Sequence, residues 1–543
     1  MALKKNDEIK LNIDSVTPLG SAVGRYDGMA VFVRNAVPGD EILARIIKTS
    51  KNYAVGIVRE IITPSPDRIE SDCPVSDKCG GCSFRCMSYH LELEAKKDFV
   101  QQNIRRIGGI DFEVEKIIGA DDTCFYRNKA QYPVRIENGV FTAGFYAFKS
   151  HRVIPAFSCM LQPREFALGL KAFEKWTLES GVDSFDERTG RGLLRHIYFR
   201  KAFATGQVMA CAVINGKSIP NQELLVSLLH QAFPKLKSVA VNINLKNTNV
   251  ILGDKTNIIW GDDKITDILL GRKFVISPES FYQVNHSQCE KLYSCAADFA
   301  QLTGSETVLD MYCGAGTIGL TLADKCKQLY GVEIVESAVN NARENALING
   351  IGNAEFICAD AFEGAKILTR KGVKPDVVIV DPPRKGCQKE LFDIIEDLGA
   401  KRIVYVSCNS ATLARDLQIL NSKGYRLKRL AAVDLFPRTA HVETVVQLVR
   451  KKPDTYIDIT VDMDERDLTS SEAKATYDEI KDYIFDKHCV KVSSLYIAQV
   501  KQKHGIIERD CYNNSKKESP KQPQCPPEKV KLIEEALRYF KMI

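Results

Sequence analysis

Repeated strand–helix units after residue 271 constrain the fold of this chain more than any other feature. The strand expected over 307–311 turns through glycines into a helix, and further strands are expected over 329–335, 376–386 and 402–409. These stretches are short, rich in Val, Ile and Leu, and separated from one another by helical patterns. Such alternation predicts a mostly parallel sheet with helices on both faces, because parallel strands need a crossover connection.

The chain of 543 residues is too long for a single hydrophobic core, and its pattern changes several times. Short alternating runs separated by turn signals over residues 3–62 predict a small OB-like β-barrel, and mixed strands and helices follow it. We therefore expect a multidomain α/β protein with an N-terminal barrel, a central α+β domain, a Rossmann-like domain and a small C-terminal helical extension. The expected boundaries are 1–64, 65–270, 271–452 and 453–543.

Composition and the N-terminal sequence bear on the cellular compartment in which this protein works. The net charge of +6 is compatible with a polyanionic partner and equally with a soluble protein of small charge excess. The N-terminal stretch MALKKNDEIK lacks the apolar run of a signal peptide, and no segment reaches the length of a membrane span. We expect a cytoplasmic protein with no membrane contact. The 17 cysteines are then core residues, metal ligands or reactive thiols rather than a disulfide framework.

Three closely spaced cysteines predict a metal site. Cys73, Cys79 and Cys82 are separated by five and then two residues, and Gly80 and Gly81 let the backbone turn tightly around a bound group. A fourth thiolate is needed to close a four-cysteine site, and the spacing leaves both structural zinc and an iron–sulfur cluster open. The candidates for the fourth ligand are Cys86, Cys124 and Cys159.

Basic residues among aromatic ones suggest contact with RNA in the first two domains. Arg127, Lys129 and Arg135 lie in strands of the central domain beside aromatic residues, a mixture suited to single-stranded bases and phosphates. The alternative is a solvated strand edge. In the barrel, the alternative to phosphate contact is a set of solvated charges, and the similarity to OB-type RNA-binding barrels favours contact with RNA. The basic residues in question are Arg25, Arg45, Lys48 and Lys51.

The glycine-rich turn at 314–319 matches GxGxxG, which alone fits NAD as well as S-adenosylmethionine. Glu333 ends the next strand, where an acid binds ribose hydroxyls. Asp310 and Tyr312 at the first strand end, and Asp381 in an Asp-Pro-Pro turn after a later strand, are typical of methyltransferases. The combination predicts that this domain binds S-adenosylmethionine.

Cys408 follows a buried strand, where an α/β sheet presents chemistry to its cleft. Methylation of carbon 5 of a pyrimidine needs such a thiol, because addition of a thiolate to carbon 6 makes carbon 5 nucleophilic, and a base must later remove the carbon 5 proton. Glu443, in a segment at 433–451 expected to form a terminal β-hairpin, is flanked by apolar residues that would raise its pKa. The alternatives are a buried strand-end thiol and an edge salt bridge.

Five motifs together resemble the RNA (uracil-5-)-methyltransferase family. They are FYQVN at 281–285, VLDMYCGAG at 308–316, VDPPRKG at 380–386, YVSCNSATLARD at 405–416 and FPRTAHVE at 436–443. The resemblance implies that Cys408 is the nucleophile and Glu443 the proton acceptor. It further implies that S-adenosylmethionine is bound by Gln283, Tyr312, Glu333 and Asp381. It implies a [4Fe-4S] cluster ligated by Cys73, Cys79, Cys82 and Cys159.

The resemblance spans about residues 3–450 and extends to the barrel, which is similar to a TRAM domain. Family members with both barrel and cluster resemble 23S rRNA enzymes, so we expect a uridine of 23S rRNA as substrate, with tRNA as the alternative. A radical S-adenosylmethionine methylthiotransferase is disfavoured because its CxxxCxxC spacing is absent, and an inactive RNA-binding protein because Cys408 and Glu443 are present. We expect a monomer with no obligate protein partner. Residues 453–543 depart from the family's usual end, and their role is open.

Overall fold

The computed structural model describes residues 3–451, 476–488, 490–506, 524–540 and 542–543. The chain divides into two compact units, Met1–Thr455 and Tyr456–Ile543. Among the described residues, no helix combines the length and apolarity required to cross a bilayer.

The N-terminal strands form a closed barrel in the order β1-β2-β3-β5-β4. Side chains alternate along β1, so that Ile9, Leu11 and Ile13 enter the barrel core while their neighbours face solvent. The predicted small barrel is therefore confirmed as a closed five-stranded structure. Its strands are β1 Glu8–Val16, β2 Ala22–Tyr26, β3 Met29–Arg34, β4 Glu41–Thr49 and β5 Tyr53–Thr63.

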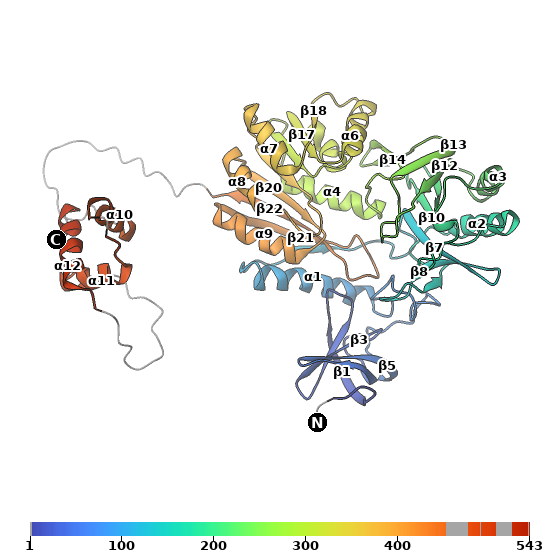
Figure 1. Ribbon diagram of the computed structural model, residues 1–543, viewed down its shortest axis with the longest axis horizontal. Helices are drawn as coiled ribbons and strands as arrows, with labels where there is room; N and C mark the ends of the chain where they lie inside the picture. The colour runs from blue at the N-terminus through green and yellow to red at the C-terminus, as the bar shows by residue number, and fades with distance from the viewer. Residues whose placement is uncertain (1–2, 452–475, 489, 507–523, 541) are drawn as a thin grey trace. The chain divides into compact units, whose positions relative to one another are not determined.

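A seven-stranded sheet with the order β13-β12-β11-β10-β7-β8-β9 follows in the middle of the chain (Figure 1). Helices α2 (Phe166–Ser180) and α3 (Gln222–Ala232) pack on one face of it through a core that includes Phe173, Trp176 and Leu229. The strands are β7 Lys129–Glu137, β8 Val140–Tyr146, β9 Val153–Pro155, β10 Leu194–Lys201, β11 Val208–Ile214, β12 Leu236–Ile243 and β13 Lys255–Gly261. A two-stranded sheet of β14 (Ile265–Leu269) and β15 (Arg272–Ile276) leads onward.

The expected strand–helix alternation forms an eight-stranded sheet, β18-β17-β16-β19-β20-β22-β21-β6. The first five strands in this order are parallel, and β22 enters antiparallel to β20. The terminal hairpin begins earlier than expected, at Tyr425, because 434–442 is its connecting loop. The strands are β6 Lys116–Ile118, β16 Thr307–Met311, β17 Gln328–Glu333, β18 Ala354–Cys358, β19 Val377–Val380, β20 Arg402–Ser407, β21 Tyr425–Val433 and β22 Glu443–Arg450.

Helices cover both faces of this sheet, as the sequence predicted (Figure 1). One face packs on α4 (His286–Ala300), α5 (Thr317–Leu322) and α6 (Glu336–Ile348). A 3₁₀ turn at Ala323–Lys325 directly follows α5. The other face packs on α7 (Ala361–Arg370), α8 (Lys389–Leu398), α9 (Ser410–Ser422) and α1 (Tyr89–Arg106). Thus α1 and β6 precede the central sheet in sequence, but they pack with the eight-stranded sheet.

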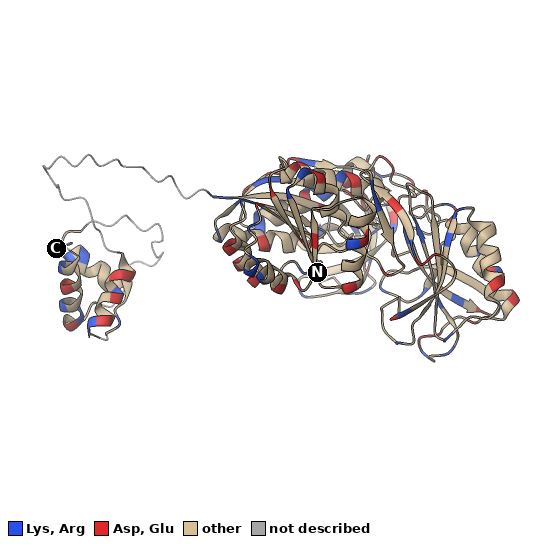
Figure 2. Ribbon diagram, turned by 90° about the horizontal axis from the view of Figure 1, so that it is seen from above, with Lys and Arg blue, Asp and Glu red and all other residues tan. Residues whose placement is uncertain are grey.

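The second unit contains α10 (Tyr477–His488), α11 (Ser494–Lys503) and α12 (Pro527–Tyr539) in its described part. Ile480, Ile497 and Leu537 belong to its small apolar core. Basic and acidic residues are interspersed along these helices (Figure 2). The sequence YIDITVD at 456–462 predicts a short strand, and the polar, Pro-rich stretch 513–529 predicts a linker. The first stretch and residues 513–523 of the second lie outside the described residues.

Candidate functional site

Functional groups gather at one edge of the eight-stranded sheet because parallel strands end there together. Glu333 ends β17, Asp381 follows β19 and Cys408 follows β20. Since β22 runs antiparallel to β20 and Thr444 pairs with Ser407, Glu443 at the start of β22 lies near Cys408, which follows β20. These residues surround a cavity of about 750 Å³, within the usual size range of ligand sites. All six predicted catalytic and cofactor-binding residues line it, including Gln283 and Tyr312.

The glycine turn after β16 shapes the floor of this cavity. Tyr312 has φ of +63°, a left-handed conformation that a non-glycine residue adopts at a cost, and Gly316 follows at +78°. Asp310 lies behind the turn and accepts the Gly319 N–H at 2.9 Å, where a Cβ on residue 319 would collide with its carboxylate. Burial raises the pKa of Asp310 to about 8. Asp310 therefore supports the turn rather than lining the cavity.

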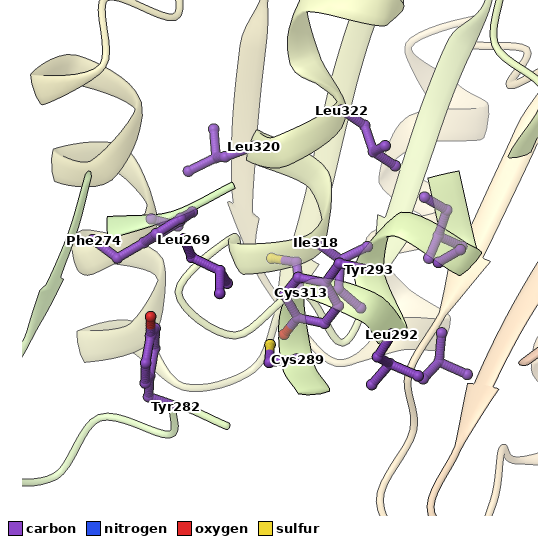
Figure 3. Close-up of a cluster of buried hydrophobic side chains, with 14 of the residues drawn as sticks. Leu269, Phe274, Tyr282, Cys289, Leu292, Tyr293, Cys313, Ile318, Leu320 and Leu322 are labelled. Carbon is purple, nitrogen blue, oxygen red and sulfur yellow. The ribbon is translucent and has the colours of Figure 1, made fainter. Parts of the chain in front are cut away.

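Apolar side chains pack against the glycine turn that follows β16 and hold it in place. Cys313, Ile318, Tyr293 and Cys289 lie together in one buried cluster (Figure 3). The Tyr293 hydroxyl is 2.9 Å from the Thr317 hydroxyl, which joins α4 to the start of α5. The turn is consequently attached to a rigid core, which is what precise ligand positioning requires.

Glu333 and Gln283 are held in place on two walls of the cavity. The Glu333 carboxylate accepts backbone N–H groups of Gly314 at 3.1 Å and Val335 at 2.9 Å. Gln283 is buried, and its backbone carbonyl accepts a hydrogen bond of 2.7 Å from the side-chain amide of Asn128. A carboxylate at the end of the second strand, beside a glycine turn, is the arrangement that binds ribose hydroxyls.

Cys408 and Glu443 share an electrostatically negative environment. Burial raises the pKa of Glu443 to about 8, with a further rise from Asp381 and an opposing effect of Arg384. The flanking apolar residues thus have the effect expected from the sequence. Burial also raises the pKa of Cys408 to about 11, and Glu443 and Asp381 add to the rise. In the ligand-free protein the thiol is therefore protonated at neutral pH.

The loop 434–442, which leads into Glu443 and carries the cavity residues Phe436 and His441, is held by buried charges. Lys96 of α1 donates to Glu92 at 2.7 Å and to Asp434 at 2.6 Å, all three being buried. Glu92 also accepts the N–H of Arg438, whose φ is +68°. A buried ion network of this kind costs desolvation energy, so it argues for positional precision rather than for stability.

A second cavity, of about 80 Å³, is lined by Cys73, Cys79, Cys82 and Cys159. The Gly80 N–H donates to Tyr146 at the end of β8, and Phe125 and Arg127 donate to the carbonyls of Met160 and Leu161, which brings the distant segments together. Cys86 and Cys124 are absent from this lining. Among the described residues, no group of three or more His, Cys, Asp or Glu side chains is arranged to hold a single metal ion.

Cations surround the four thiols. Burial raises the pKa of Cys82 to about 12, the other cysteines raise it further, and Arg85 opposes the rise. Burial also raises the pKa of Cys79, and Arg34 opposes that rise. Arg85 Nη1 and Arg127 Nε are buried without a hydrogen-bond partner, and both residues line the cavity. Unsatisfied donors beside four thiols fit an anionic group held by thiolates.

The two cavities are linked through the backbone. The N–H groups of Ser83 and Phe84, immediately after Cys82, both donate to the carbonyl of Arg438. The Arg127 guanidinium lies 6.0 Å from the ring centre of Phe436, which lines the larger cavity. The four-cysteine segment therefore helps to hold the loop that precedes Glu443.

Several cavity residues were not predicted individually, although each adjoins a predicted motif. Arg384 follows the Asp-Pro-Pro turn, His441 precedes Glu443 by two residues, and Asp360 follows strand β18 at the same sheet edge. Position after a strand end was the available signal for Asp360. Of the three predicted RNA-contacting cations of the central domain, Arg127 and Lys129 lie near the cavity wall, whereas Arg135 donates to the carbonyl of Phe185 elsewhere on the sheet.

Comparison with known proteins agrees with this geometry. A family model described as tRNA (uracil-5-)-methyltransferase matches residues 218–451. An uncharacterized RNA methyltransferase of Halalkalibacterium halodurans is 44% identical over 450 residues, covering 83% of this chain and 98% of the relative. A similar protein of Clostridium acetobutylicum is 43% identical over 451 residues, 82% and 98% of the two chains.

This chain belongs to the RNA (uracil-5-)-methyltransferase family. A crystal structure of Pyrococcus abyssi tRNA (uracil-54, C5)-methyltransferase in complex with S-adenosyl-L-homocysteine is also similar, with 27% identity and a TM-score of 0.67. The match covers 81% of this chain and 99% of the archaeal one. The protein is thus an S-adenosylmethionine-dependent RNA uracil-5 methyltransferase, and the predicted family, cofactor class and RNA substrate are confirmed.

Proposed function

We propose that this methyltransferase transfers a methyl group to carbon 5 of a uridine in 23S rRNA, acting as a cytoplasmic monomer, with Cys408 as nucleophile and Glu443 as proton acceptor. The observation that carries the chemistry is that Cys408 and Glu443 lie near each other in a single cavity with four further predicted ligand residues. Thiol and carboxylate in one cavity are what carbon 5 methylation demands.

The four cofactor contacts in the proposal are Gln283, Tyr312, Glu333 and Asp381. Glu333 suits the ribose hydroxyls, because its carboxylate is fixed by two backbone N–H groups at the end of β17. Asp381, whose pKa burial raises to about 7, lies close enough to raise the pKa of both Cys408 and Glu443. S-adenosylmethionine supplies the methyl group as an electrophile.

Cys408 begins the reaction by adding its sulfur to carbon 6 of the uracil, which gives carbon 5 the electron pair it needs to attack the methyl group. The thiol must lose its proton for this addition, and its raised pKa means that deprotonation accompanies substrate binding. Arg384 lowers the pKa of Cys408 and lines the cavity, so it favours the thiolate.

Glu443 completes the reaction by accepting the proton from carbon 5. The electron pair of that carbon–hydrogen bond re-forms the carbon 5–carbon 6 double bond and expels the Cys408 thiolate. The target base must leave its stack, since carbons 5 and 6 are covered within stacked RNA. A carboxylate with a pKa near 8 is a better proton acceptor than one with an ordinary pKa.

The four-cysteine cavity supports a [4Fe-4S] cluster as part of the proposal, held by Cys73, Cys79, Cys82 and Cys159. These thiols line a cavity of about 80 Å³, and the lining also includes Arg85 and Arg127, each with a buried donor that has no hydrogen-bond partner. Methyl transfer consumes no electrons, so we assign these thiols a structural role next to the loop at 434–442.

The choice of 23S rRNA rests on the barrel and four-cysteine site being joined to the catalytic domain in one chain. The similar Pyrococcus abyssi protein is a tRNA (uracil-54, C5)-methyltransferase, and this favours tRNA as the second candidate. The domain boundaries 1–64, 65–270, 271–452 and 453–543 belong to the same proposal, with the barrel as a TRAM-like RNA-binding domain.

One experiment separates the substrates. Total 23S rRNA and total tRNA from cells lacking this protein are incubated with the purified enzyme and S-adenosylmethionine carrying a labelled methyl group. We expect label in 23S rRNA as 5-methyluridine, mapped by nuclease digestion and mass spectrometry. Label in tRNA alone would replace the proposed substrate by the second candidate, and label at a base other than uridine would overturn the proposed chemistry.

A further inference from the structure

Two cations face each other on the central sheet, on the side away from helices α2 and α3. Lys129 of β7 pairs with Arg200 of β10 in the antiparallel ladder. Their neighbours Ala130 and Phe199 point into the core beneath the two helices. Because side chains alternate along a strand, Lys129 and Arg200 project from the opposite face. Tyr198, on that same face, packs into the core shared with the catalytic domain.

This face abuts the segment that forms one wall of the catalytic cavity. Arg200 Nη1 donates to the carbonyls of Ser277 and Ser280, at 3.0 and 2.8 Å. Asn128, next to Lys129, donates its side-chain amide to the Gln283 carbonyl and its backbone N–H to Val284. Gln283 and Val284 both line the cavity. The two cations therefore adjoin the segment 277–284, which supplies Gln283 and Val284 to the cavity wall.

Lys129 and Arg200 lack a counter-charge, since neither forms an ion pair with a carboxylate among the described residues. Burial lowers the pKa of Lys129 to about 8, and the only charged neighbours that act on it are Arg200 and Arg127, which lower it further. Arg200 Nε and Nη2 are buried without a hydrogen-bond partner. The adjacent Lys201, by contrast, pairs with Glu165.

Such an arrangement is costly unless an anion completes it, because buried charges are normally paired. A purely structural role accounts for Arg200 Nη1, which ties down the segment 277–280, but not for its other donors or for Lys129. RNA bound with a uridine in the cavity brings backbone phosphates to the cavity rim, and Lys and Arg are the usual ligands of phosphate.

We propose that Lys129, with Arg127 and Arg200 beside it, binds a backbone phosphate of the RNA strand next to the uridine that enters the catalytic cavity. The inference rests on the proposed function, and it adds a substrate-binding site on the central domain. Such a site would position the strand without reading its sequence.

The first test measures salt dependence of binding. The probe is a synthetic RNA fragment, drawn from whichever RNA class the wild-type enzyme methylates, and its Kd is measured from low to moderate salt in the presence of S-adenosylhomocysteine. Lys129→Met should weaken binding and reduce the slope of log Kd against log salt by roughly 0.7, the value for one lost phosphate contact in single-stranded RNA. Lys129→Arg should retain most of the slope.

The matched control is Lys171→Met, because Lys171 is exposed on α2, on the other side of the sheet. It should leave both Kd and slope unchanged. Calorimetric binding of S-adenosylhomocysteine verifies that each variant is folded. A Lys129→Met protein that is folded and keeps the wild-type slope would overturn the proposal.

The second test changes the RNA, and its main measurement is made on the wild-type enzyme. Neutral methylphosphonate linkages are placed one at a time around the target uridine, and the wild-type enzyme is assayed on each fragment. We expect one linkage beside the uridine to weaken binding about tenfold, within the range for a charge-assisted hydrogen bond, and Lys129→Met to be insensitive to it. Wild-type methylation with no sensitive linkage refutes the phosphate site alone, whereas failure of the unmodified RNA to be methylated refutes the proposed function instead.

Discussion

The two cysteine sites of this protein differ in the sign of the charge around sulfur. Cys408 lies among carboxylates, and Glu443 and Asp381 raise the pKa of its thiol. Cys82 and Cys79 lie beside Arg85 and Arg34, which oppose the rise in pKa that burial causes at both thiols. Carboxylates disfavour the thiolate at the proposed nucleophile, whereas arginines favour the thiolate at the proposed cluster ligands. The proposal thus assigns one side-chain type to two chemistries, and the neighbouring charges differ accordingly.

The largest expected effect separates the two sites completely. Cys408→Ala should reduce methylation to background and abolish the covalent adduct with RNA containing 5-fluorouridine, because Cys313, the other thiol in the described lining of the cavity, is packed in the buried core. The iron content should be unchanged. Cys358→Ser, at an exposed cysteine, is the control and should remain fully active. Turnover by Cys408→Ala would show that another residue is the nucleophile.

Glu443→Gln comes next, with a loss of roughly 10²–10⁴-fold in turnover, the usual contribution of a general base. The variant should accumulate enzyme–RNA adducts on denaturing gels, since addition and methyl transfer precede its step. Wild-type resolution of the adduct should accelerate as pH rises through about 8, where Glu443 ionises. An adduct that resolves normally in the variant would point to a different base.

The raised pKa of Glu443 also predicts a stability effect with a definite sign. The folded protein holds this proton between the unfolded pKa of about 4.5 and the folded value of about 8, so wild-type stability falls as pH rises across that window. Glu443→Gln should therefore melt at a higher temperature than wild type at pH 8 and at a similar temperature at pH 5. Equal melting temperatures at both pH values would contradict the assignment of a buried, ionisable Glu443.

Cys159→Ser addresses the second site. We expect the anaerobically purified variant to lose iron and brown colour while still binding S-adenosylhomocysteine, because the cofactor wall comes from other segments. Methylation should fall about tenfold or more through loss of support for the loop at 434–442, since small misplacements near a reaction are costly. Cys86→Ser and Cys124→Ser are the controls and should retain iron. A wild-type protein that is colourless and contains zinc would refute the cluster.

Arg85→Gln should have the smallest effect. Removing one cation beside the thiols should accelerate iron loss to a chelator several-fold without preventing assembly, because the four cysteines remain. Lys78→Gln, at an exposed lysine between Cys73 and Cys79, provides the comparison and should lose iron at the wild-type rate. Identical rates for Arg85→Gln and wild type would remove the electrostatic distinction between the two cysteine sites.

Much of the fold was predictable because its signals are local. The closed barrel, the alternating strands and helices, and the strand ends at Glu333, Asp381 and Cys408 follow from hydrophobic periodicity and from where each apolar run stops. The central domain expected from the sequence, 65–270, included the residues that form helix α1 and strand β6, because they precede the central sheet in the chain. Their packing on the eight-stranded sheet depends on long-range contacts that no local pattern encodes.

The sequence by itself determined which residue types occupy the strand ends, and with them the carbon 5 chemistry, because parallel strands deliver their carboxyl ends to one edge. Only the tertiary structure decided which distant residues meet there. It brought Gln283 to the cavity, separated Arg135 from Lys129, and set Lys129 opposite Arg200. It also placed Cys159, and neither Cys86 nor Cys124, beside the three clustered cysteines. Strand pairing and domain packing fix these neighbours, and both depend on contacts between segments far apart in the chain.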